Sequence, residues 1–170
     1  VQISWSTSEL TDKERLFLAN QHEILGHLNT DNSDYHFKLA EQLRDGHEWL
    51  YSQSFDYFSE NLPSEDADLV LDILQVYELI GDTYSRLSDK SGISDTQVKF
   101  PGFDGNNEPE FMSFVDALEK DNRYVDVIQA GNRNSHSAKV HVYERMIAKW
   151  QELGKPYTLT KEQLIEILEA

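Results

Sequence analysis

The sequence predicts an all-α fold, a multihelical single domain of about seven helices with one irregular insert at about 88–109. Two capping boxes, Thr11 with Glu14 and Thr160 with Gln163, indicate helix starts near both ends of the chain. Over most of the chain between them, apolar residues recur at intervals of three and four, which is the period of a helix with one buried face. The insert loses this period and is rich in glycine and proline.

Length and composition limit the class of protein. The chain has 170 residues and a mass of 19.7 kDa, the size of one domain. It contains no cysteine, which excludes disulfides, thiolate nucleophiles and cysteine-based zinc sites. Because no apolar run approaches the ~20 residues of a membrane span and the start does not resemble a signal peptide, we expect a cytoplasmic protein.

We predict an N-terminal extension over 1–9 and one helical domain over 10–170. The first helix follows Thr11, and its apolar arc consists of Phe17, Leu18, Gln21, Ile24, Leu25 and Leu28. A second helix is expected from about 34 to Gly46. A third is expected over 47–60, with a buried face made of Leu50, Tyr51, Phe55 and Phe58, which Leu62 continues.

The C-terminal half is organised around the longest predicted helix, about 65–88, which follows Pro63 and takes Ser64 as its N-cap. Its apolar stripe is wide, so we expect it to be central. After the insert, which is expected to hold a short extended piece at 98–100, Pro109 begins a short helix. Three β-branched residues favour an extended segment at 125–130. A turn over 131–136 then precedes helices over 137–153 and after Thr160.

The charge of the chain excludes two classes of partner. The formal net charge is −16, and ten acidic residues fall between Asp45 and Asp82 with no Lys or Arg among them. Nucleic acid requires clustered bases that neutralise its phosphates, and anionic membranes attract the same kind of surface. We therefore expect no direct binding of nucleic acid and no membrane partner.

The sequence gives no sign of a metal or cofactor. His22 and His27 resemble a zinc-protease motif but lie five residues apart, which places them about 140° apart on a helix instead of on one face. His136 and His141 have the same spacing. There is no phosphate-binding loop, no dinucleotide fingerprint and no nucleophile elbow. We predict no metal and no cofactor, and no catalytic residue is assigned.

Three stretches resemble the YfbU family of small bacterial proteins. They are 14–21 (ERLFLANQ), 98–104 (VKFPGFD), and the C-terminal segments 143–146 (YERM) and 157–160 (YTLT) with Trp150 between them. Tyr124 and the pair Ala130–Gly131 also sit where that family carries them. The resemblance covers about 10–170 and implies a multihelical, cytosolic and oligomeric protein. The family's biochemical role is unassigned, although its occurrence beside helix-turn-helix domains has suggested ligand binding, so the resemblance implies a fold and no reaction.

The segment 100–104 is the first candidate site. Phe100 and Phe103 flank Pro101 and Gly102, and Asp104 follows. We expect Gly102 to adopt a turn conformation with positive φ and Asp104 to accept backbone N–H groups in an Asx turn. The segment is either a loop attached to the core by its two Phe side chains or the wall of a pocket.

The turn 131–136 is the second candidate, because it holds Arg133 and His136 just before a predicted helix start. Backbone amides, the helix dipole and Arg133 would favour a small anion there. The alternative is a polar turn in which Ser135 or Ser137 caps the helix.

Three further residues stand out from the apolar pattern. Gln21 lies on the arc of the first helix, so its amide needs a partner, either a backbone carbonyl or a ligand. Trp49 lies off the buried face of 47–60, and Tyr57 lies at its edge. They are expected either to be covered by another helix or to form a contact between subunits.

Taken together, these features favour a cytosolic, homo-oligomeric binding or interaction protein whose ligand, a small molecule or an anion, is unknown. The alternative is a small acidic enzyme, hydrolase-like, that uses carboxylates. A carboxyl group with a raised pKa in a deep cleft would favour the enzyme. A large exposed apolar surface suited to self-contact would favour the interaction protein.

Overall fold

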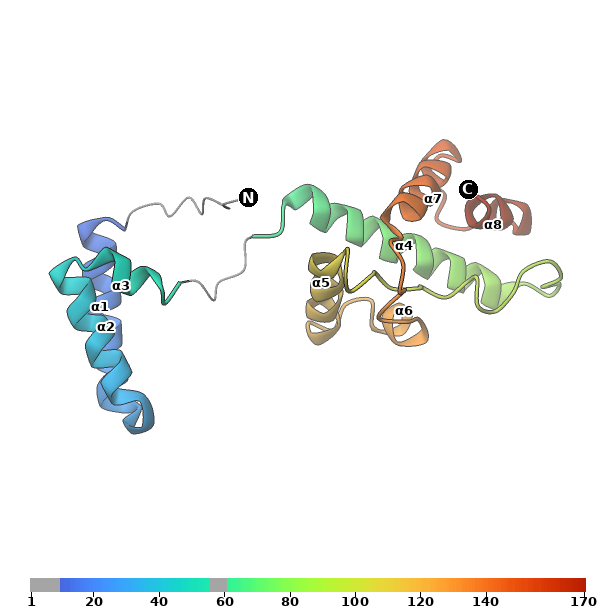
Figure 1. The fold of residues 1–170 in the computed structure, drawn as a ribbon. Helices are drawn as coiled ribbons and strands as arrows, with labels where there is room; N and C mark the ends of the chain where they lie inside the picture. Colours follow the sequence, from blue (N-terminus) through green and yellow to red (C-terminus); the bar gives the residue numbers. More distant parts are fainter. Residues whose placement is uncertain (1–9, 56–60) are drawn as a thin grey trace. The chain divides into compact units, whose positions relative to one another are not determined.

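A computed structural model describes residues 10–55 and 61–170 of the chain (Figure 1). The all-α class is confirmed, because the described residues form eight α-helices and one 3₁₀ helix and no strand. Their contacts divide the chain into two compact units, 1–60 and 61–170, which we call unit 1 and unit 2. The sequence predicts one domain over 10–170, whereas the contacts within the chain cluster into these two units. Each unit is described by itself.

Unit 1 is a helical hairpin. It consists of α1 (Asp12–Leu28), the 3₁₀ turn η1 (Thr30–Asn32), α2 (Ser33–Asp45) and the short α3 (Glu48–Ser52), and α1 packs along α2 (Figure 1). The predicted capping box is present, since Thr11 accepts the N–H of Glu14 and the Glu14 carboxylate accepts the N–H of Thr11. Gly46 ends α2 in the left-handed conformation, at φ 73°.

The contact between α1 and α2 is made by small residues. Ala19 and Gly26 are buried, and the Phe37 ring lies so close to Gly26 that a Cβ there would be 2.6 Å from its Cε1 atom. Most of the predicted apolar arc lies on the side of α1 that faces away from α2, while Leu18 packs against the small core of unit 1, so unit 1 does not bury the arc as a whole. The arc members Phe17, Ile24 and Leu28 are 72%, 57% and 75% exposed.

The third predicted helix is covered by the described residues only up to 55. Within 47–55, the helical part is Glu48–Ser52, because the amides of Ser54 and Phe55 bond to carbonyls three residues back and close turns instead of continuing the helix. Tyr51 is buried as predicted, but Leu50 is 43% exposed. Phe58 lies outside the described residues.

Unit 2 is built around α4 (Ser64–Arg86), which contacts α5 (Pro109–Lys120), α6 (Val125–Ala130), α7 (Val140–Glu152) and α8 (Lys161–Leu168) (Figure 1). The prediction that this helix is central is confirmed, since seven of its residues from Val70 to Thr83 are buried. The prediction that Ser64 is the N-cap is wrong, because Ser64 is the first helical residue and Pro63 holds the cap position. The second capping box, Thr160 with Gln163, begins α8.

Two segments of unit 2 differ from the sequence prediction. Residues 125–130 form α6 and not an extended segment, because Tyr124 takes a left-handed conformation and its carbonyl accepts the N–H of Ile128, whose side chain is buried. Tertiary burial thus overrides β-branched propensity. The insert is irregular as predicted, but Val98 and Lys99 form a turn and a bend, so 98–100 is not an extended piece. Among the described helices, none is long and apolar enough to span a membrane.

Candidate functional site

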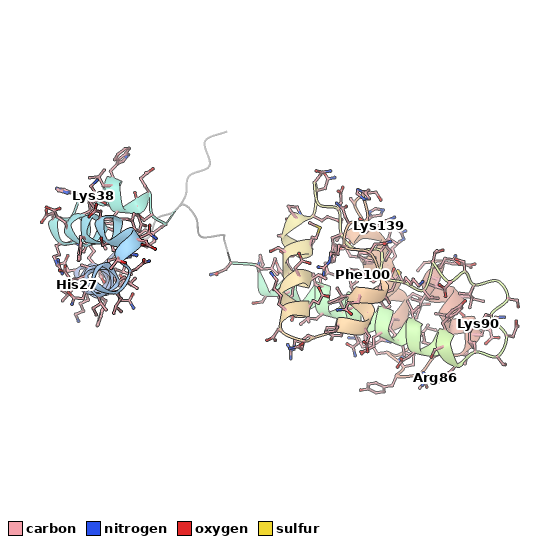
Figure 2. The ribbon with its side chains drawn as sticks, turned by 90° about the horizontal axis from the view of Figure 1, so that it is seen from below. His27, Lys38, Arg86, Lys90, Phe100 and Lys139 are labelled. Carbon is pink, nitrogen blue, oxygen red and sulfur yellow. The ribbon has the colours of Figure 1, made fainter. Side chains whose placement is uncertain are left out.

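The segment 100–104 is anchored in the core of unit 2 by aromatic packing. Phe100 and Phe103 are each 1% exposed, and their ring centroids lie 5.7 Å apart. Tyr77 and Tyr143 join the same cluster with centroids 5.5 to 5.9 Å from these rings. In Figure 2, Phe100 lies in the middle of unit 2. This position matches the expectation of a loop attached to the core by its two Phe side chains.

Gly102 joins this loop to the turn at 131–136. Its φ is 84°, as predicted, and a Cβ there would lie 2.5 Å from the Asn132 carbonyl oxygen. The Tyr143 hydroxyl donates to the Gly102 carbonyl at 2.5 Å. The Phe100 carbonyl accepts the N–H of Asn132 at 2.8 Å, and the Phe103 carbonyl accepts the N–H of Ser135 at 3.1 Å. The two candidate segments, 30 residues apart in the chain, therefore lie side by side, which the sequence does not reveal.

Two buried carboxylates hold this region together. Asp104 and Glu108 are 3% and 5% exposed. Asp104 accepts the N–H of Asn106 at 3.1 Å, the predicted Asx turn, and the Asn107 side-chain amide. These bonds, the Asn107 one first, lower the pKa of the Asp104 carboxyl group. Asp104 is thus a structural acceptor within its own loop.

Glu108 caps α7 from a distance. Its Oε1 atom accepts the N–H groups of Lys139 and Val140 at 2.7 and 2.9 Å, and its Oε2 atom accepts the N–H of Asp104 at 2.9 Å. The prediction that Ser135 or Ser137 caps this helix is wrong, since α7 begins at Val140 and a carboxylate from the start of α5 satisfies its amides. Nothing local in the sequence indicates this role.

Arg133 and the first amides of α7, the groups expected to bind an anion, already have acidic partners. Arg133 pairs with Asp116 and Glu119 of α5. Hydrogen bonds from Gln129 and then Arg133 lower the pKa of Glu119. The first amides of α7 are taken by Glu108. The exposed His136 has a left-handed backbone, at φ 55°, and donates its N–H to the Asn134 side chain. The geometry therefore does not favour an anion at this turn.

The remaining candidates lie in unit 1. Gln21 is exposed within unit 1, so the core of this unit does not bury its amide. It lies between Phe17 and Ile24 on the outward side of α1. Trp49 is 74% exposed, which means that no helix of the described unit covers it. Tyr57 lies outside the described residues.

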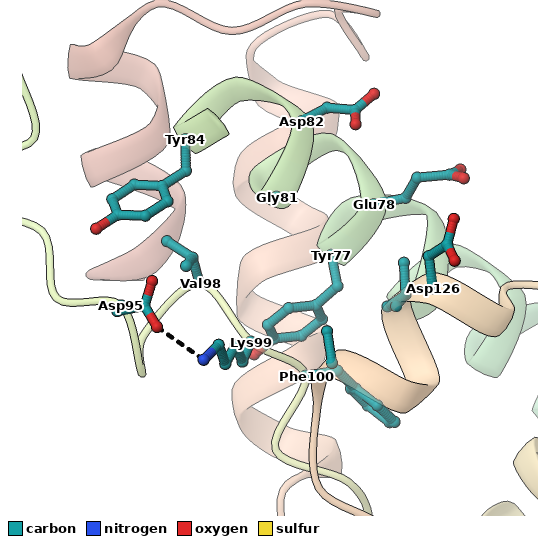
Figure 3. A pocket seen from close by; sticks show the side chains of 12 residues that line it. Tyr77, Glu78, Gly81, Asp82, Tyr84, Asp95, Val98, Lys99, Phe100 and Asp126 are labelled. Atoms are coloured by element: carbon teal, nitrogen blue, oxygen red, sulfur yellow. Dashed lines mark ion pairs between the residues drawn. The ribbon is translucent and has the colours of Figure 1, made fainter. Parts of the chain in front are cut away.

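A pocket that the sequence did not predict lies in unit 2 (Figure 3). Its volume is about 320 Å³, and α4, the insert and α6 line it. The apolar part of its wall consists of Tyr77, Tyr84, Val98, Phe100, Val127 and Ala130. Of the predicted site residues, Phe100 is the one that reaches this wall.

The charged part of the pocket wall is strongly acidic. It contains the carboxylates of Glu78, Asp82, Asp95 and Asp126 and one ammonium group, that of Lys99. Lys99 pairs with Asp95 at 2.7 Å, and Figure 3 shows this pair on the side of Tyr77 opposite to Glu78 and Asp126. In the described part of the chain, Glu78, Asp82 and Asp126 form no ion pair with a Lys or Arg.

The charge of one pocket carboxylate, Glu78, acts on the neighbouring Tyr124. The pKa of the Tyr124 hydroxyl is raised, first by burial and then by the charge of Glu78. Over residues 10–55 and 61–170, no group of three His, Asp or Glu side chains is placed to hold a metal ion. The pocket therefore combines aromatic walls with acidic groups that do not converge on one point.

The sequence model that defines the YfbU domain family matches residues 8–170. The chain belongs to the YfbU family. It is 31% identical over 169 residues to UPF0304 protein MJECS11 of Methanocaldococcus jannaschii, an alignment that covers 95% of this chain and 99% of that relative. The family resemblance of the sequence is confirmed, and neither match names a ligand or a reaction.

Proposed function

We propose that the protein is a binding protein for a small organic cation, an amine with an apolar part, held in the pocket between α4, the insert and α6. The observation that carries this proposal is the composition of the pocket wall, with three carboxylates unpaired by Lys or Arg in the described chain beside aromatic rings. The volume of about 320 Å³ lies at the lower end of the range of small-molecule sites. An alkyl or aryl amine of a few carbon atoms fits this space.

The chain's own ammonium groups support the choice of a cation. Lys99 extends to Asp95, and the Lys90 Nζ atom lies 4.5 Å from the centroid of the Tyr84 ring. The hydrogen bond and charge of Lys99, with a smaller contribution from Lys90, lower the pKa of the Asp95 carboxyl group. Aromatic faces attract cations through their quadrupole, and carboxylates add charge. A ligand amine would use the same chemistry at Glu78 and Asp126.

The alternative, a hydrolase-like enzyme, finds less support. A carboxyl group that serves as a general acid needs a raised pKa. In the described residues, each carboxyl group with a shifted pKa is shifted downward, as at Asp95 and Asp104. Carboxylates that remain charged suit the binding of a cation. No specific observation favours a second function.

Titration calorimetry with phenethylammonium at low salt tests the proposal. We expect binding that weakens as salt is added, and no heat from the uncharged 2-phenylethanol. The double variant Glu78→Gln with Asp126→Asn should weaken binding at least about tenfold, equivalent to ~1.4 kcal/mol. Lys99→Met should strengthen it by removing a competing cation.

The matched control is Glu65→Gln, which removes an exposed carboxylate from the same helix outside the pocket and should leave the affinity unchanged. Equal binding of the amine and the alcohol, or no binding of the amine, would refute the proposal. Because this site lies within unit 2, the test does not depend on self-association, and the homo-oligomeric state and cytoplasmic location stay predictions at this point.

A further inference from the structure

The outward side of α1 is an apolar surface that no described helix of unit 1 covers. Nine large hydrophobic side chains of the described residues are exposed, and eight belong to unit 1. Five of these eight lie on α1, namely Leu16, Phe17, Ile24, Leu25 and Leu28. We call the surface formed by Phe17, Gln21, Ile24, Leu25 and Leu28 the α1 face. Contiguous apolar surfaces of this kind mark interaction sites in soluble proteins.

We propose that the α1 face is the contact between two copies of this chain, which associate through their α1 helices in antiparallel orientation. The spacing supports this arrangement. Phe17, Gln21, Ile24 and Leu28 follow one another at intervals of four, three and four, the spacing of the seam in paired helices. In an antiparallel pair related by a two-fold axis, Phe17 would face Leu28 of the other copy, and Gln21 would face Ile24.

Charge makes a second copy a suitable occupant. The chain has a net charge of −16, so most of its surfaces would repel their own copies. The α1 face itself carries no charged side chain, and of the α1 carboxylates Glu14 alone lies in line with it, one heptad before Gln21. Glu23 pairs with Arg44 of α2 at 2.7 Å, Asp12 pairs with Arg15 at 2.8 Å, and Glu14 bonds to Thr11. A self-contact over 17–28 brings no charged side chains of the α1 face together, and the same register places Glu14 near Asp31 of the other copy beyond the ends of this face, whereas a contact at Trp49 would bring Asp45 and Glu48 close to their copies.

The described part of the chain offers no other apolar surface of comparable size. In unit 2, the single large hydrophobic side chain that is exposed among the described residues is Tyr157, at 90%. A helix face with four large apolar side chains needs a complementary surface of similar extent. The identical face of a second copy provides it.

The proposal also explains Gln21. Its amide was expected to be buried, yet it is exposed in the single chain and lies in the middle of the α1 face. A polar residue within a helical seam fixes register and weakens association. In the pair, Gln21 would be buried and would set the antiparallel register, while Gln21→Leu would strengthen the contact.

Sedimentation velocity of the full chain tests the contact. We expect the wild type to sediment at about twice 19.7 kDa at micromolar concentration. Ile24→Asp should raise the dissociation constant at least about 100-fold, because it places two like charges in an apolar seam. Gln21→Leu should lower the dissociation constant. Since Ile24 is exposed in the single chain, the far-ultraviolet circular dichroism of the monomeric variant should be retained.

Two controls separate this contact from others. Tyr157→Asp changes an equally exposed aromatic residue in unit 2 and should leave the oligomer intact, as should Trp49→Ala. A monomeric wild type, or an oligomer that Trp49→Ala dissociates and Ile24→Asp does not, would overturn the proposal.

The register can be tested by cross-linking, since the chain contains no cysteine. The double variant Gln21→Cys with Ile24→Cys should form a covalent dimer on mild oxidation, because the antiparallel register places each thiol opposite its partner in the other copy. Tyr157→Cys is the control for chance collisions and should cross-link at least about tenfold more slowly. Equal rates for the two variants would contradict the antiparallel register.

Discussion

The two units use apolar residues in opposite ways. Unit 2 buries Phe100, Phe103 and Tyr143 around α4 and exposes one large hydrophobic side chain among its described residues. Unit 1 buries Ala19, Leu39, Leu43 and Tyr51 and leaves larger side chains outside. Both have helices with a clear apolar period. The comparison shows that the period identifies a face that will be buried, but not whether the burial occurs within the chain.

Size accounts for part of this difference. Unit 1 spans 60 residues and unit 2 spans 110. Small folded units bury a smaller fraction of their surface, and a two-helix hairpin has no third layer to cover the outer side of each helix. Unit 1 can make a close contact between α1 and α2 through Ala19 and Gly26. It has no further described helix to cover the other side of α1.

The largest expected difference between the units comes from replacing one Phe by Ala in each of them. Phe103→Ala should lower the free energy of unfolding of unit 2 by about 3–5 kcal/mol, because it leaves a cavity in an aromatic cluster. Phe17→Ala should change the free energy of unfolding by less than about 0.5 kcal/mol, because Phe17 is 72% exposed. Urea unfolding, at a concentration that keeps the chain monomeric, measures both. A comparable loss for Phe17→Ala would show that α1 is covered within one chain.

An intermediate effect is expected at Glu108, which joins segments within unit 2. Glu108→Ala leaves three buried or partly buried amides without their acceptor and should cost about 2–4 kcal/mol. Glu108→Gln keeps an oxygen for the two α7 amides but places an amide N–H against that of Asp104, so about 1–2 kcal/mol is expected.

The control for Glu108 is Glu110→Gln, an exposed carboxylate in the first turn of the same helix, which should be nearly neutral. Urea unfolding followed by the fluorescence of Trp150, which is buried in unit 2, measures each variant. Equal losses for Glu108→Gln and Glu110→Gln would show that the distant cap contributes little.

The sequence predicts those features that depend on neighbouring residues. The capping boxes at Thr11 and Thr160 join residues three apart, and Gly46 ends α2 by its own conformation. The Asx turn at Asp104 is local as well. Helix starts and turns of this kind follow from short-range hydrogen bonds, so they can be derived without knowledge of the fold.

Features that depend on distant residues escape the sequence. Glu108 caps a helix that starts 32 residues later, and no spacing rule connects the two. The pocket gathers acidic residues from α4, the insert and α6, which become neighbours only in the fold. Residues 125–130 are helical because burial of Ile128 outweighs local propensity. The arc on α1 contains the expected residues, but which surface covers them is decided by packing.

The smallest expected effect is a pH dependence confined to unit 1. The Nδ1 atoms of His22 on α1 and His36 on α2 lie 2.9 Å apart, so one ring must donate and the other accept, which requires at least one neutral ring. Burial and then the charge of His36 lower the pKa of His22 below its ordinary value of 6.5. The unfolded chain therefore binds this proton first, and the stability of unit 1 is complete above about pH 6.5 and decreases as the pH falls below it.

Thermal unfolding at pH 7.5 and 5.5 measures this effect through the helical signal of unit 1. His22→Asn should reduce the difference between the two pH values, because it removes the titrating ring while keeping a side chain that can donate to His36. His141→Asn, which changes an exposed histidine of unit 2, should preserve the difference. A decrease in stability of unit 1 that survives His22→Asn would assign the pH dependence to another group and leave the two units alike in this respect.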